Sequence, residues 1–137
     1  MEHQFTLAYW CVLIAALLPM VCAYIAKGAG GIGRSKAQGG FDNNDPRGWL
    51  QKQTGLPARA NAAQANSFEG LPFFIGAVVI AHQLGAAQHG LDLLALAYVL
   101  LRAIYIALYV ADRATLRSLT WAAGMAVNVA ILFLGYR

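Results

Sequence analysis

The chain has 137 residues, of which 59% are hydrophobic and 12% charged, and its formal net charge is +4. The charged fraction is roughly half that of soluble proteins, and a soluble domain this small cannot bury so much apolar surface. A bilayer removes that difficulty, so the composition favours an integral membrane protein. The basic residues gather mainly in two connecting stretches, which indicates membrane orientation and argues against a nucleic-acid partner.

Four apolar segments predict an all-α, four-helix bundle that forms a single membrane domain over residues 1–137. The first segment has 22 residues without a formal charge, enough to cross a hydrocarbon core of ~30 Å. The second becomes strongly apolar near residue 67, but its helix is expected to begin earlier, at Arg59. The expected helices cover 5–26, 59–87, 92–111 and 117–135.

The connection 27–58 differs in character, because it contains eight glycines, two prolines and five lysines or arginines. The turn at 112–117 is also basic, whereas the turn between the second and third helices has no lysine or arginine. The positive-inside rule therefore places 27–58 and 112–117 in the cytoplasm and both termini on the opposite side.

Residues 28–33, GAGGIG, match the spacing of a dinucleotide-binding glycine motif. That motif functions between a strand and a helix, and here it follows a membrane helix, so we interpret it as a flexible connection. Cys11 and Cys22 lie eleven residues apart in the first segment, too far for a disulfide within one helix, and are expected to be packing residues. No group of metal-ligand residues has the spacing of a metal site.

Polar residues within the apolar segments form two helical stripes. Arg59, Asn66 and Glu69 share one face of the second helix. The third helix carries the second stripe, made of Arg102, Tyr105, Tyr109 and Asp112. The second and third helices are antiparallel, so these stripes should meet the start of the fourth helix, at Arg117 and Ser118, in a polar pocket within the cytoplasmic half.

A purely structural interpretation of the same residues stays open. Glu69 and Arg102 could form a buried ion pair that holds two helices together, and tyrosines near a membrane surface are often interface anchors. Arg102 lies deepest, and a structural role is expected for it.

Two segments resemble known signatures of the MAPEG family, the membrane-associated proteins in eicosanoid and glutathione metabolism. They are RANAAQANSFEGLPFF at 59–74 and RAIYIALYVADRATLRS at 102–118, and DNNDPR at 42–47 is similar to bacterial members. The resemblance implies a homotrimer, in a bacterial inner membrane, that binds glutathione as co-substrate in clefts between subunits. It also implies transferase or peroxidase activity on small lipophilic electrophiles.

The resemblance also implies roles for individual residues. An arginine at the start of the fourth helix, matching Arg117, would stabilise the glutathione thiolate, with Tyr105 and Tyr109 assisting in the same cleft. Arg113 is the alternative match for that arginine. The residues implied in binding the tripeptide are Arg59, Asn66, Glu69, Arg113 and Ser118.

One position departs from the pattern of several eukaryotic members. They carry an arginine that helps to hold glutathione where this chain has Ala62. The departure leaves a second hypothesis open, in which the chain is a non-catalytic accessory or structural subunit of a larger membrane complex. A small transporter is a third interpretation, and the absence of paired inverted repeats counts against it.

Overall fold

The computed structural model describes residues 4–136, and its long elements are four α-helices. They are α1 (Leu7–Gly30), α3 (Gly55–Gln83), α4 (Gln88–Val110) and α5 (Ala114–Phe133). All four are long and apolar enough to cross a membrane. Two short elements, the 3-10 helix η1 (Lys36–Gln38) and α2 (Pro46–Gln51), lie in the connection between α1 and α3. The predicted all-α, four-helix architecture is confirmed.

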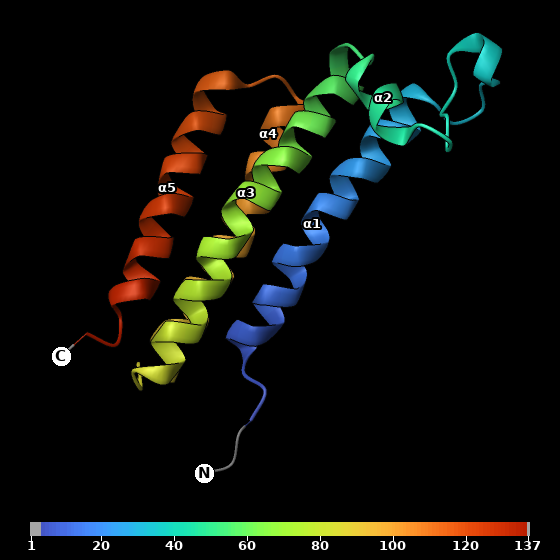
Figure 1. The fold of residues 1–137 in the computed structure, drawn as a ribbon. Helices are drawn as coiled ribbons and strands as arrows, with labels where there is room; N and C mark the ends of the chain where they lie inside the picture. Colours follow the sequence, from blue (N-terminus) through green and yellow to red (C-terminus); the bar gives the residue numbers. More distant parts are fainter. Residues whose placement is uncertain (1–3, 137) are drawn as a thin grey trace.

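The four long helices lie side by side, with the described ends of the chain at one end of the bundle (Figure 1). The α1–α3 connection and the α4–α5 turn are both at the opposite end, which we call the loop end. Helix α3 contacts α1, α4 and α5, and α1 also contacts α4. The basic connecting stretches therefore share one end, as a membrane protein with four antiparallel spans requires.

Small side chains allow the helices to approach closely. Every third or fourth residue of α1 is buried, which produces a continuous stripe along one face. Its members are Ala8, Cys11, Ala15, Pro19, Cys22, Ala26 and Gly30. Cys11 and Cys22 are free and buried in this stripe, as expected for packing residues. Small interfacial residues are typical of membrane helices, where van der Waals contact between backbones replaces the hydrophobic effect.

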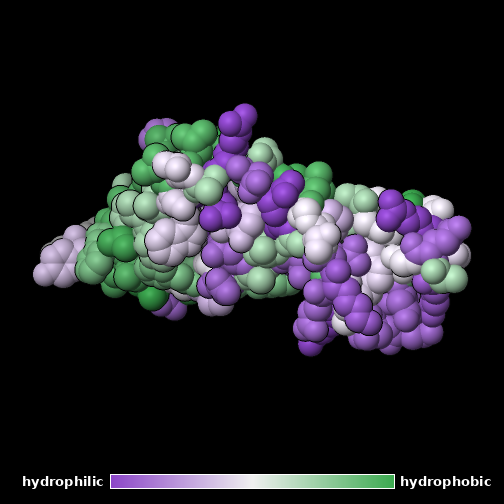
Figure 2. All heavy atoms as spheres, turned by 90° about the horizontal axis from the view of Figure 1, so that it is seen from above, coloured by the Kyte–Doolittle hydropathy of each residue, from purple (hydrophilic) through white to green (hydrophobic). Residues whose placement is uncertain are grey.

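Large apolar side chains instead cover the outside of the bundle. Leu17, Leu100 and Phe133 are all more than half exposed. Seen from the loop end, apolar side chains surround the flank of the bundle while polar ones gather over the α1–α3 connection (Figure 2). This distribution suits a bundle whose flank faces lipid.

The first turn of α1 is held by polar groups at the end opposite the loops. Asp92 Oδ1 accepts a hydrogen bond from the Ala8 backbone N–H at 2.9 Å, and Thr6 Oγ1 lies 3.0 Å from His82 Nε2. The His82 ring also stacks on Tyr9, with 4.2 Å between the ring centroids. The bond to Asp92 satisfies one of the backbone donors that an α-helix leaves unpaired at its start.

The connection between α1 and α3 is shorter and better packed than the sequence predicts. Helix α1 continues to Gly30 and α3 already begins at Gly55, so the connection covers 31–54 and not 27–58. Trp49 of α2 is buried, and its Nε1–H donates to the Gly39 carbonyl at 3.0 Å. The glycines were predicted to make this segment flexible, but the indole packs on Gly30 and Gly31.

The α4–α5 turn places a non-glycine residue in the left-handed region. Asp112 has φ 60°, the Arg113 N–H donates to the Leu108 carbonyl, and the Asp112 N–H donates to the Tyr109 carbonyl. These are the two bonds of a Schellman motif, whose left-handed position is usually glycine. The motif reverses the chain and thereby fixes where Arg117 begins to project from α5.

We expect Asp112→Gly to leave stability unchanged or to raise the free energy of unfolding by up to ~1 kcal/mol, because glycine has no Cβ to strain. Asp112→Val should lower it by about 1–2 kcal/mol, since a β-branched residue fits this φ poorly. Thermal unfolding in detergent measures both variants. Equal stability of the two would contradict a turn that depends on the left-handed conformation.

Candidate functional site

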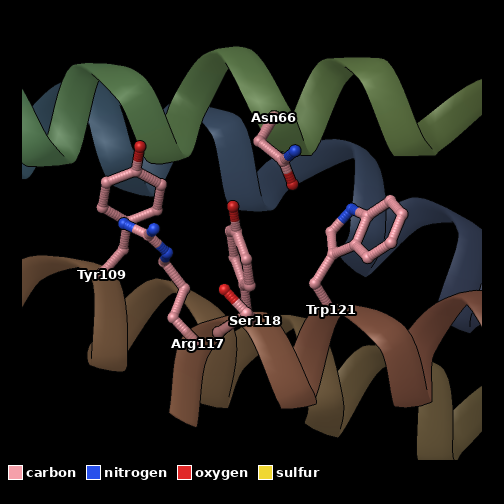
Figure 3. Close-up of a pocket in the computed structure, with 6 residues that line it drawn as sticks. Asn66, Tyr109, Arg117, Ser118 and Trp121 are labelled. Atoms are coloured by element: carbon pink, nitrogen blue, oxygen red, sulfur yellow. The ribbon is translucent and has the colours of Figure 1, made fainter. Parts of the chain in front are cut away.

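A polar pocket of about 230 Å³ opens between α3, α4 and α5 in the half of the bundle nearer the loops. Asn66 reaches into it from α3, and Arg117, Ser118 and Trp121 reach into it from α5 (Figure 3). The lining residues are Asn66, Tyr105, Tyr109, Arg117, Ser118 and Trp121. The pocket therefore combines a guanidinium, an amide and three hydroxyls with the indole of Trp121.

Helical spacing explains why these side chains meet. Tyr105 and Tyr109 are four residues apart on α4, and Arg117 and Trp121 are four residues apart on α5, so each pair shares one face of its helix. Helix α3 runs antiparallel to α4 and parallel to α5, and it brings Asn66 to the same level.

Arg117 lies directly against an aromatic wall. Its Cζ is 4.2 Å from the centroid of the Tyr109 ring, and the Tyr105 and Tyr109 rings meet edge to face at 5.7 Å. A guanidinium over a tyrosine ring is attracted by the ring quadrupole. Figure 3 shows the Arg117 side chain extended toward Tyr109. No carboxylate within the described residues forms an ion pair with Arg117, so its positive charge is available to an anion in the pocket.

The other polar groups of the wall are also partly free. Ser118 Oγ donates to the Ala114 carbonyl of its own helix at 3.1 Å, which leaves the hydroxyl oxygen able to accept. Asn66 Nδ2 is 3.4 Å from Glu69 Oε2, a long contact at an exposed position. The pocket thus offers donors and acceptors to a polar ligand as well as a cation.

The structure brings five of the eight predicted site residues to this pocket, and three lie outside its lining. Glu69 is exposed beside Asn66, within reach of a ligand that extends out of the pocket. Arg113 is exposed at the N-cap of α5. Arg59 Nε donates to the carbonyl of Val110, the last residue of α4, at 3.0 Å.

Arg59 therefore interacts with the C-terminus of α4, where a cation also complements the helix dipole. We expect Arg59→Ala to lower the free energy of unfolding by about 1–2 kcal/mol, since a hydrogen bond from a charged donor is lost. Thermal unfolding in detergent tests this expectation. Unchanged stability together with a large loss of ligand affinity would instead assign Arg59 to the site.

Sequence reasoning missed Trp121, whose indole forms one side of the pocket. The signal was present, because Trp121 lies one turn after Arg117 and must share its helix face. It was hidden because tryptophan near a membrane surface is ordinarily interpreted as an interface anchor.

A second cavity of about 320 Å³ lies between α2 and the first half of α3. Its polar groups come from Arg47, Gln51, Asn61 and Gln64, and Leu50 and Phe68 contribute apolar surface. None of these residues belongs to the predicted stripes.

Chemically, the polar pocket between α3, α4 and α5 is suited to stabilise a developing anion. A guanidinium stays protonated throughout the physiological range, and it acts most strongly where water is partly excluded. A thiol with an unperturbed pKa near ~8.5 would become a better nucleophile beside it, because the thiolate is the reactive form.

Fold and site together define a four-helix integral membrane protein with a cation-lined polar pocket near one membrane face. The MAPEG family model matches residues 7–136, almost the whole chain, so the protein belongs to the MAPEG family. Members of this family are generally glutathione-dependent membrane enzymes. The resemblance in the sequence is confirmed. No curated protein and no solved structure gave a match.

Proposed function

We propose that the protein is a membrane-bound, glutathione-dependent transferase or peroxidase that acts on lipophilic electrophiles. The observation that best supports this proposal is the position of Arg117. Its guanidinium lies over Tyr109 in an open polar pocket, and no carboxylate among the described residues pairs with it. In this function Arg117 stabilises the glutathione thiolate, and the hydroxyls of Tyr105 and Tyr109 donate to the sulfur. The thiol proton passes to water, and the thiolate sulfur forms a bond to the electrophilic atom while the leaving group departs with its bonding electrons.

Ligand access supports the proposal. A charged tripeptide would enter from the aqueous side at the loop end, where the described polar residues gather. An apolar electrophile would arrive through the lipid that surrounds the exposed flank of α5, on which Leu119 and Trp121 are exposed. Asn66, Glu69 and Ser118 would hold the peptide, and Arg113 would contribute at its margin, whereas Arg59 would act through its bond to the Val110 carbonyl.

The proposal includes the cellular arrangement. The loop end is cytoplasmic, because it carries most of the lysines and arginines, and both termini face the other side of a bacterial inner membrane. The functional unit is a homotrimer, as family members typically form. Crosslinking in native membranes and mass measurement in detergent test these two statements.

The direct test of function is a glutathione titration of the detergent-purified protein at neutral pH, followed by thiolate absorbance in the ultraviolet. Saturable absorbance is expected with glutathione and not with S-methylglutathione, which fills the same site but has no ionisable thiol. Binding without thiolate formation would refute the proposed activation. No binding to the intact oligomer would refute glutathione as the ligand.

One observation favours a second candidate function. Position 62 is alanine, and no lysine or arginine of α3 lines the pocket. A site that has lost a ligand cation is what an accessory or structural subunit of a larger complex would show. Stoichiometric co-purification of partner subunits, combined with the absence of thiolate formation, would favour this candidate.

A further inference from the structure

Arg102 is a buried cation behind the pocket. Only 6% of the residue is exposed, and it lies inside the membrane-spanning helix α4. Charged groups in such a position are costly unless polar partners surround them. The only ion pair among residues 4–136 is between Lys36 and Asp42 in the connection, so the Glu69–Arg102 pair that the structural interpretation left open is not formed. Arg102 must be stabilised by other groups.

Those groups are an amide, a hydroxyl and an aromatic ring. Arg102 Nη2 donates to Asn66 Oδ1 at 3.0 Å and to Ser67 Oγ at 3.1 Å. Its Cζ lies 4.2 Å from the centroid of the Tyr105 ring. Asn66 and Tyr105 both line the pocket, although Arg102 itself does not. The buried guanidinium is therefore in direct contact with two parts of the pocket wall.

The contact with Asn66 determines which end of the amide is free. A guanidinium is only a donor, so it holds the carbonyl oxygen and turns the NH₂ group away. The Asn66 amide nitrogen lies on the side of Glu69, where it can donate to a carboxylate or carbonyl oxygen of a ligand. Without Arg102 the amide could rotate and present either end.

Ser67 holds the Arg102 guanidinium from a position outside the pocket lining. Its hydroxyl donates to the Ala63 carbonyl at 2.8 Å and accepts from Arg102, and only 5% of the residue is exposed. The two guanidinium groups are linked through two rings that contact each other. Arg102 packs on Tyr105, and Arg117 packs on Tyr109.

We infer that Arg102 is a positioning residue, which orients the Asn66 amide and holds Tyr105 for binding of a peptide thiol. The role rests on the proposed glutathione function and deepens it. It also differs from the structural role expected for Arg102, because loss of the side chain should reduce affinity through Asn66 and not only stability.

A double-mutant cycle on glutathione affinity tests the inference, using Arg102→Met, Asn66→Ala and the double variant. Each single substitution should weaken binding about tenfold, the size of one charge-assisted hydrogen bond. The double variant should bind almost as weakly as either single one, because both remove the same interaction. Multiplicative losses, or wild-type affinity in a merely less stable Arg102→Met protein, would overturn the inference.

Two further variants keep the test decisive if Arg102→Met does not fold. Arg102→Lys retains the charge and N–H donors but loses the planar guanidinium, so it should bind a few-fold more weakly and replace Arg102→Met in the cycle. Ser67→Ala loosens the anchor without altering the pocket lining and should also weaken binding by a few-fold. Wild-type affinity in both variants would overturn the inference, whereas a wild-type protein that binds no glutathione would overturn the proposed function itself.

Discussion

Arg117→Ala is expected to abolish thiolate formation at neutral pH while the bundle stays folded. With the guanidinium present, the pKa of bound glutathione falls below its free value of ~8.5, so the thiolate exists at neutral pH. Without it, the pKa returns toward that value and the thiolate appears only in more alkaline solution. A pH titration of thiolate absorbance measures the shift directly. Turnover should fall by about 10²–10³, the usual loss when one donor to a developing anion is removed.

Two control substitutions test whether the effect is specific to the Arg117 guanidinium. Arg117→Lys keeps a charge but loses the planar stacking on Tyr109, so it should recover only part of the thiolate. Arg113→Ala removes the same charge from an exposed position one turn earlier. If Arg113→Ala abolished the thiolate and Arg117→Ala did not, the roles of the two arginines would have to be exchanged.

The pocket was largely predictable because helices impose a strict geometry. Residues spaced by three or four share a face, and antiparallel helices place the end of one level with the start of the next. Those two facts were sufficient to expect Asn66, Tyr105 and Tyr109 near Arg117, and the structure lines one pocket with them.

Side-chain direction was less predictable than helix faces. Arg59 lies seven residues before Asn66, on the same stripe but about 10 Å further along the axis, where the open C-terminus of α4 is the nearer partner. A long side chain can reach several hydrogen-bond partners, and sequence spacing does not show which of them it contacts. The same ambiguity concealed the partners of Arg102, since Glu69 was a possible partner by spacing, whereas the structure shows a hydrogen bond to the Asn66 amide oxygen.

Helix ends were misjudged for a physical reason as well. The first helix was expected to stop before Lys27, where the charges and glycines begin, yet α1 continues to Gly30. Glycine is tolerated in membrane helices where another group packs closely on it, and here that group is the Trp49 ring. Trp49 itself lies in a stretch that has no apolar periodicity, so this contact could not be predicted from the residue pattern.

Gly31→Ala should therefore be strongly destabilising. A Cβ at this position would lie 2.8 Å from Trp49 Cζ2 and 2.9 Å from the Phe41 backbone nitrogen. Neither group can give way easily, since Trp49 is buried and its Nε1–H is bonded to the Gly39 carbonyl. We expect a loss of about 2–3 kcal/mol in the free energy of unfolding, the upper range for an overpacked contact.

Gly28→Ala is the matched control, three residues earlier in the same glycine run. A Cβ there meets no atom within 4 Å, and alanine is a better helix former, so stability should rise by about 0.5–1 kcal/mol. Thermal unfolding in one detergent compares the pair. Changes of opposite sign in the free energy of unfolding would establish that Trp49 packs on the end of α1, because a flexible connection would tolerate both alanines equally. Equal effects would show that α2 is not held against α1, and the glycines would then serve flexibility after all.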